Sequence, residues 1–143
     1  MATAKRIVTA MERRSLKTAG PFFTPDQIDP AILEVIPYAR SGRSITVELT
    51  TAEFSCVCPF SGLPDFAVVT ISYVPRRFLV EMKSLKYYFC AFRNVKVYNE
   101  HAVGKIADDL ARILKPRRLT VTAAFTSRGG IVNKVTASVE AAR

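Results

Sequence analysis

Alternating hydrophobic and polar positions predict β-strands in several parts of the chain. In the first such stretch, Ile45, Val47 and Leu49 are separated by threonine and glutamate. A period of two is typical of a strand that buries one face and exposes the other. On this pattern, or on a content rich in β-branched and aromatic residues, the predicted strands are residues 44–50, 65–74, 119–125 and 131–139, with a short one at 78–80.

Two stretches repeat their apolar residues at helical spacing instead. Residues 81–93 and 100–114 place apolar and aromatic side chains three and four positions apart, which predicts two amphipathic helices. Asn99 is expected to cap the second helix, and Pro116 lies just beyond its end.

The predicted order is strand, strand, helix, helix, strand, strand. This order indicates an α+β fold with an antiparallel four-stranded sheet and two helices on one face. Such a sheet has two free edges. We therefore expect it to close into a ring or barrel with neighbouring subunits, with sites at the subunit boundaries.

The predicted domain covers residues 44–143, and residues 1–43 form an N-terminal extension. Residues 1–20 are basic and have no clear period, which predicts a disordered or loosely attached arm. Four prolines between residues 21 and 43 indicate an irregular lead-in that wraps the domain or a neighbour. The alternative is a short turn of helix over residues 31–36.

Composition narrows the class of protein. Apolar residues make up 49% of the 143 residues, which favours a globular chain. No apolar run reaches the roughly 18 residues that a membrane span needs, and the N-terminus lacks the apolar core of a secretory signal. Three cysteines without disulfide-scaffold spacing predict a reduced, cytoplasmic setting.

The net charge of the chain indicates the kind of partner that it fits. The formal net charge of +9 fits an anionic partner such as a phosphorylated cofactor or nucleic acid, and it equally fits a solvated basic face. The single histidine, His101, has no cysteine pair near it at zinc-ligand spacing, so no metal site is expected.

One constrained loop between the first two strands carries the main candidate chemistry. It runs from Phe54 to Phe66 and contains Cys58 and, seven residues later, its only acid, Asp65. A thiol nucleophile attacks an electrophilic carbon while a nearby carboxylic acid protonates the atom left behind. Cys56 is a rival nucleophile, and a free cysteine is often only a small buried hydrophobe.

Two cationic groups are candidates for phosphate binding. Lys83 and Lys86 share one face of a helix start with Ser84 between them, and Arg128 precedes a tight turn at Gly129. The ammonium group of lysine and the forked guanidinium group of arginine both bind phosphate oxygens. Solvated lysines and ordinary hairpin chemistry explain the same residues without a ligand.

The segment Tyr98, Asn99, Glu100 combines an aromatic ring with an acid. A buried glutamate accepts two parallel hydrogen bonds from the exocyclic amine and ring N–H of a guanine-like base, while the ring packs nearby. The alternative is helix capping by Asn99, with Glu100 in the first turn.

Three motifs, in order, resemble those of the 7-cyano-7-deazaguanine reductases. They are the catalytic loop at Cys58–Phe66, the signature motif at Glu81–Tyr88 followed by Phe92–Asn94, and the late glycine turn at Thr126–Gly130. The similarity covers roughly residues 44–132.

The resemblance implies a fold, a reaction and an assembly. The fold is the tunnelling fold, and the short members of the family stack two pentameric rings with sites between subunits. The reaction reduces the nitrile of 7-cyano-7-deazaguanine to the primary amine 7-aminomethyl-7-deazaguanine with two NADPH, in the biosynthesis of the tRNA base queuosine. No metal, membrane or stable nucleic-acid partner is implied.

The resemblance also implies roles for individual residues. Cys58 adds to the nitrile carbon as a thioimide, Asp65 donates the proton to the nitrogen, and Glu100 pairs with the guanine-like edge. Further implied contacts are Glu81, Tyr98 and Asn99 for the base, and Lys83, Ser84, Lys86, Arg128 and Gly129 for NADPH.

One departure and two alternatives accompany this interpretation. Asn99 stands where the family usually has a histidine that helps to handle protons, which puts the second reduction step in question. Relatives that add ammonia to the nitrile on tRNA, forming archaeosine, lack the lysine-rich motif, so Lys83 and Lys86 favour the reductase. A basic RNA-binding module is disfavoured because aromatic–basic RNA signatures are missing.

Overall fold

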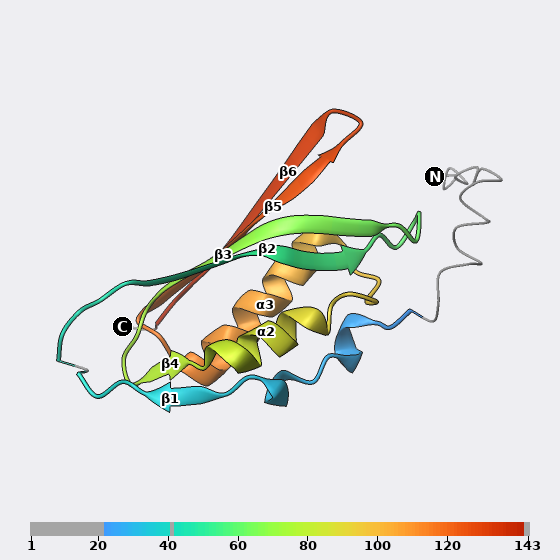
Figure 1. Cartoon of the computed structure of the whole chain (residues 1–143). Helices are drawn as coiled ribbons and strands as arrows, with labels where there is room; N and C mark the ends of the chain where they lie inside the picture. Colours follow the sequence, from blue (N-terminus) through green and yellow to red (C-terminus); the bar gives the residue numbers. More distant parts are fainter. Residues whose placement is uncertain (1–21, 41, 142–143) are drawn as a thin grey trace, which may run out of the picture.

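A four-stranded antiparallel sheet is covered on one face by two helices in the computed structural model, which describes residues 22–40 and 42–141 (Figure 1). The long elements are β2 (Val47–Val57), β3 (Pro64–Val74), α2 (Met82–Cys90), α3 (Asn99–Leu114), β5 (Arg118–Arg128) and β6 (Ile131–Glu140). The order across the sheet is β2-β3-β5-β6. The predicted α+β fold and the order of its elements are therefore confirmed, whereas the predicted basic arm at 1–20 lies outside the described residues.

The turn that joins β2 to β3 is shorter than the sequence predicted. Cys56 lies within β2 and pairs with Asp65 in β3, so the turn between the strands is only residues 58–63. The predicted loop from Phe54 to Phe66 is too long because ladder pairing continues almost to the turn.

Helix α3 begins one residue earlier than predicted. Asn99 is its first residue, and Tyr98 holds the N-cap position without a side-chain hydrogen bond, so the predicted cap by Asn99 is wrong. The side-chain oxygen Oδ1 of Asn99 is instead buried without a hydrogen-bond partner. At the other end, Lys115 adopts a left-handed conformation with φ of 44° and ends the helix.

The lead-in to the sheet wraps this same domain. It contains two short 3-10 turns, η1 (Pro25–Gln27) and η2 (Pro30–Ile32), followed by β1 (Val35–Pro37), which pairs antiparallel with β4 (Phe78–Val80). The helical turn predicted over 31–36 is therefore shorter and is followed by a strand. Ile28 and Leu33 are buried in the core, so the lead-in contributes to the same hydrophobic interior.

The core lies between the sheet and the two helices, and Asp109 is buried beside it. Tyr73, Tyr88, Phe54 and Phe92 are among its largest fully buried side chains. Tyr88 on α2 donates a hydrogen bond through its hydroxyl to Asp109 on α3 (2.7 Å). This bond joins the two helices across the interior.

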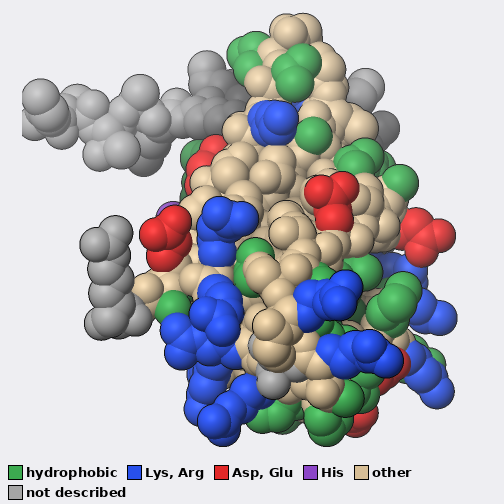
Figure 2. Space-filling view, turned by 90° about the vertical axis from the view of Figure 1, so that its left-hand side faces the viewer, with side chains coloured by type: hydrophobic (Ala, Val, Ile, Leu, Met, Phe, Trp, Pro, Cys, Tyr) green, Lys and Arg blue, Asp and Glu red, His purple; other side chains and the backbone are tan. Residues whose placement is uncertain are grey.

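The surface combines a basic face with a polar sheet face. Lysine and arginine side chains gather on the lower half of the face in Figure 2. On the helix-free side of the sheet, threonine and serine hydroxyls pair across neighbouring strands, for example Thr50 with Thr70 (3.2 Å) and Thr122 with Thr136 (3.3 Å). Among the described helices, none is long and apolar enough to cross a membrane.

Candidate active site

A short turn after β2 holds Cys58. The backbone N–H of Cys58 donates to the carbonyl of Leu63 (2.9 Å), and the N–H of Gly62 donates back to the carbonyl of Cys58 (2.9 Å). Gly62 has φ of 68°, a left-handed conformation that favours glycine. The buried hydroxyl of Ser61 accepts from the N–H of Leu63 (3.2 Å). These bonds fix the turn that carries the half-buried thiol.

A bulge in β2 decides which way the two cysteines face. Up to Thr51 the odd-numbered residues face the helices, whereas after a register shift between Thr51 and Phe54 the even-numbered residues do so. One extra residue in a strand inverts the alternation. Cys56 is consequently buried opposite Asp65, and Cys58 follows two positions later.

Asp65 forms an ion pair with the end of β5. Its side chain is only 10% exposed, and its Oδ1 lies 2.7 Å from Nη2 of Arg128. The same nitrogen donates to the carbonyl of Pro64 (3.1 Å). The structure thus brings Arg128 to the start of β3 beside the Cys58 turn, and its predicted contact with a cofactor phosphate stays a prediction.

Cys56 and Cys58 differ in the pKa of their thiols because their surroundings differ. Burial raises the pKa of the Cys56 thiol to about 12, and the charge of Asp65 adds to the rise. Partial burial also raises the pKa of Cys58, but hydrogen bonds from Ser61, Phe60 and Arg128 together outweigh it, so the pKa lies below the ordinary 9.0. Because the thiolate is the nucleophile, Cys58 is the better nucleophile of the two.

The carboxyl of Asp65 is shifted the other way. Burial raises its pKa above the ordinary 3.8, against a smaller lowering by the Arg128 charge. Arg128 interacts with both groups. A thiol that ionises readily and a carboxyl that holds its proton more tightly are together suited to addition coupled with proton transfer.

The segment that leads into α3 packs against the same turn. Backbone hydrogen bonds of 2.9 and 3.1 Å join Val57, the last residue of β2, to residues 95–97. The rings of Phe60 and Tyr98 meet edge to face with centroids 5.9 Å apart. The start of α3, with Glu100 in its first turn, therefore lies next to the Cys58 turn.

Glu100 is less enclosed than the sequence predicted. The expected burial of this glutamate is wrong for the single chain, where Glu100 is exposed. Its Oε1 accepts a hydrogen bond from Nδ2 of Asn133 on β6 (3.3 Å). Sequence reasoning missed Asn133, although an amide at an inward-facing position between Ile131 and Val135 is a readable signal.

The signature motif forms the start of α2. The carboxylate of Glu81 accepts from the backbone N–H groups of Lys83 (2.8 Å) and Ser84 (2.7 Å), and these bonds lower its pKa. The buried Ser84 hydroxyl donates to the carbonyl of Glu81 (2.7 Å) and accepts from the N–H of Glu34 (3.0 Å). Lys83 and Lys86 are exposed. Glu81 and Ser84 thus support the helix, and their ligand contacts stay predictions.

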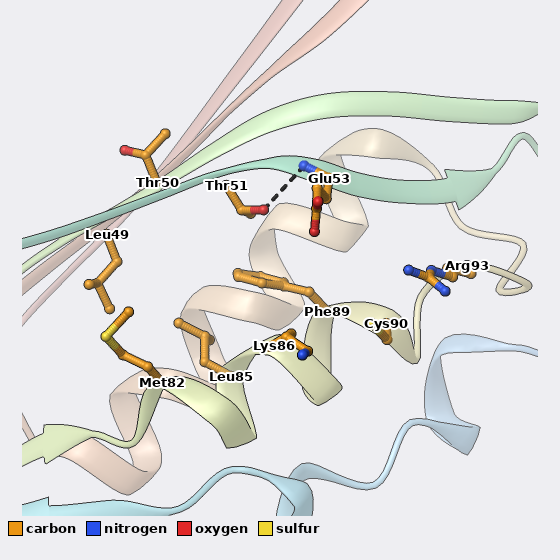
Figure 3. A pocket seen from close by; sticks show the side chains of 10 residues that line it. All are labelled: Leu49, Thr50, Thr51, Glu53, Met82, Leu85, Lys86, Phe89, Cys90 and Arg93. Carbon is orange, nitrogen blue, oxygen red and sulfur yellow. Dashed lines mark hydrogen bonds between the residues drawn. The ribbon is translucent and has the colours of Figure 1, made fainter.

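A groove of about 160 Å³ lies between β2 and α2 (Figure 3). Leu49, Leu85 and Phe89 give it an apolar floor, and Lys86 and Arg93 add two cations. The ion pairs of the described residues join Lys105 and Arg112 to Asp109, and Arg128 to Asp65. The same described residues contain no cluster of histidine, cysteine or acid that could hold a metal ion.

Comparison with known proteins identifies the family. The model of the family described as QueF-like protein matches residues 64–143. The chain is 50% identical over 115 residues to the NADPH-dependent 7-cyano-7-deazaguanine reductase of Caldicellulosiruptor bescii, covering 80% of this chain and 88% of that protein. The chain belongs to the 7-cyano-7-deazaguanine reductase family. A second reductase of this name, from Thermomicrobium roseum, is 51% identical over 108 residues, covering 76% of this chain and 84% of its own.

A solved structure supports the fold of this reductase family. The apo form of an archaeosine synthase, QueF-Like, matches with a TM-score of 0.63 over 68% of this chain and 96% of its own. At 21% identity that likeness concerns the fold alone. The much closer sequence relatives carry the reductase name, so the ammonia-adding alternative is not favoured.

Proposed function

We propose that this chain reduces the nitrile of 7-cyano-7-deazaguanine to the primary amine 7-aminomethyl-7-deazaguanine, with NADPH as reductant, in queuosine biosynthesis. The observation that carries the proposal is the arrangement in which Arg128 lies 2.7 Å from Asp65 and also interacts with Cys58, with the pKa of the thiol lowered and that of the carboxyl raised. Relatives of matching name support the assignment. The reducing cytoplasm is the expected compartment, since all three cysteines are free.

The first step is addition of Cys58 to the nitrile. The thiol proton passes to Asp65, and the sulfur forms a bond to the nitrile carbon as one π bond of the triple bond breaks. The electron pair of that π bond goes to the nitrogen, which takes the proton from Asp65. The result is a covalent thioimide, and no net proton is consumed.

The base is held by the residues that precede and begin α3. Glu100 accepts from the exocyclic amine and ring N–H of the deazaguanine, and Tyr98, 45% exposed beside Phe60, offers an aromatic surface. The unpaired Oδ1 of Asn99 is a further acceptor at this end of the helix. Glu81, to which the resemblance assigns a second contact with the base, also caps α2.

The cations of α2 fit the anionic cofactor. When bound, NADPH supplies the hydrides that convert the thioimide to the amine, two NADPH for each amine. Lys83 and Lys86 are exposed, and Arg93 adds charge to an apolar groove that suits a ring system. Arg128 and Gly129 at the β5–β6 turn would hold phosphate from the other side.

The complete site forms between subunits in this proposal. The two outer strands, β2 and β6, each have one edge without a partner strand in the described chain. Pairing of these edges between copies would close a barrel, and stacked pentameric rings are the assembly that the resemblance implies. Such pairing would cover the exposed Glu100 and bring the α2 lysines of one copy toward the turn of another.

The decisive experiment is NADPH oxidation that depends on the nitrile base. Purified chain is mixed with 7-cyano-7-deazaguanine, and intact mass is recorded without NADPH before absorbance is followed with it. Wild type should form a covalent adduct and then consume two NADPH per amine.

The matched variants are Cys58→Ala and Cys56→Ala. Loss of the nucleophile should abolish both adduct and turnover, whereas the buried Cys56 should be dispensable for adduct formation. An adduct that never leads to NADPH oxidation would reject the reductase and revive ammonia addition.

A further inference from the structure

Arg128 holds the start of β3 with two contacts from one nitrogen. Its Nη2 lies 2.7 Å from Oδ1 of Asp65 and donates to the carbonyl of Pro64 (3.1 Å). Two acceptors on adjacent residues fix the guanidinium in direction as well as distance. Arg128 remains 46% exposed, whereas the Asp65 side chain is 10% exposed. The arginine therefore lies on the solvent side of this contact, and the acid lies on the buried side.

The β5–β6 hairpin places the side chain of Arg128 beside Asp65. A register shift between Phe125 and Arg128 adds one residue to β5, which turns Arg128 onto the face that the odd-numbered residues had occupied. Gly129 and Gly130, with φ of 56° and 77°, then make a two-residue turn of the kind that needs positive φ at both positions. Asp65 lies on the same face of the sheet.

We propose that Arg128 is a positioning residue for the Cys58–Asp65 pair, acting on thioimide formation before any cofactor is bound. This inference rests on the proposed function. It differs from the cofactor-phosphate role, because a phosphate contact affects only steps that involve NADPH. The guanidinium orients the carboxyl toward the turn and offsets negative charge as the thiolate forms.

Removal of the guanidinium leaves a buried carboxyl without its charged partner. The pKa of Asp65 should rise further, and the pKa of Cys58 should rise because one hydrogen-bond donor to the thiolate is lost. Loss of a charge-assisted hydrogen bond is expected to slow thioimide formation on the order of 10- to 100-fold.

The test uses Arg128→Gln, Arg128→Lys and, as a control on the same strand, the exposed Arg118→Gln. Adduct formation with 7-cyano-7-deazaguanine is timed without NADPH, and alkylation of Cys58 by iodoacetamide is measured from pH 5 to 10. We expect Arg128→Gln to slow the adduct and to shift the alkylation midpoint upward. Arg128→Lys should restore part of both, and Arg118→Gln should change neither.

The remaining outcomes distinguish a failure of this inference from a failure of the proposed function. If Arg128→Gln forms adduct at the wild-type rate and only raises KM for NADPH, Arg128 serves the cofactor alone. If wild type forms no adduct at all, the proposed function fails, and the alkylation curves still decide whether Arg128 controls the thiol. Circular dichroism identifies misfolded variants. If Arg128→Gln is among them, Arg128→Ala replaces it, and a wild-type alkylation midpoint in folded Arg128→Ala rejects the inference.

Discussion

Cys56 and Cys58 are two positions apart, and the difference between their sulfur atoms comes from their neighbours. Cys56 is fully buried and faces a carboxylate, whereas Cys58 sits in a turn rich in donors. Sequence alone left both as candidate nucleophiles, because the spacing of the residues says nothing about burial. Only the family resemblance selected Cys58 before the structure did.

At the residue scale we predict that thiol alkylation separates the two cysteines. Because the folded pKa of Cys58 lies below 9.0, its thiolate fraction rises at lower pH than that of an ordinary thiol. Cys56, whose pKa burial raises to about 12, stays protonated at neutral pH. Iodoacetamide at pH 7.5 followed by peptide mapping should therefore label Cys58 first and leave Cys56 unlabelled. Labelling of Cys56 in the folded chain would contradict the geometry described here.

Several residues chosen for ligands have a structural partner that the sequence did not reveal. Glu81 caps α2 and Ser84 ties α2 to the lead-in, so local helix chemistry accounts for both. Arginine before two glycines predicts a phosphate contact for Arg128, yet in the structure its side chain contacts Pro64 and Asp65, more than 60 residues away in sequence. Contacts at that separation depend on strand register, which a single sequence does not state.

At the element scale, type and order were predictable and register was not. Alternation and helical spacing gave the strands and helices because each element buries one face. The bulges in β2 and β5 were not predicted, since an added residue leaves the composition of a strand unchanged while inverting its faces. Those two bulges are what place Cys56, Asp65 and Arg128 on one side of the sheet.

The contact between α2 and α3 depends on one buried acid. Asp109 accepts from the hydroxyl of Tyr88 (2.7 Å), and forms ion pairs with Lys105 (2.9 Å) and Arg112 (2.6 Å). Every polar group brought into the interior there has a partner, which is the condition for a buried charge to be tolerated.

We predict that Asp109→Ala lowers the free energy of unfolding by about 3 kcal/mol, because it leaves Tyr88 and Lys105 without their acceptor. Arg112→Ala is the matched control. Its side chain is 62% exposed, so its loss should cost about 1 kcal/mol or less. Urea unfolding followed by circular dichroism at one protein concentration measures both. Equal losses would mean that the exposed pair, and not the buried one, stabilises the contact.

At the scale of the whole molecule, the fold follows from the sequence but the finished site does not. Within residues 22–40 and 42–141, the fold brings together Cys58, Asp65 and the segment that begins α3, while Glu100, Lys83 and Lys86 are exposed. The two open sheet edges supply a reason for this, because copies that pair there would complete what one chain leaves unfinished.

We therefore predict an assembly whose mass by light scattering is several times 15.9 kDa at micromolar concentration. Turnover per chain should fall on dilution below the concentration at which the rings form. Alkylation of Cys58 should not change on dilution, because the contacts that lower its pKa lie within one chain. Since each copy carries a net charge of +9, copies repel one another, and moderate salt should screen that repulsion and strengthen the assembly. A monomer with undiminished turnover would show that one chain holds the complete site.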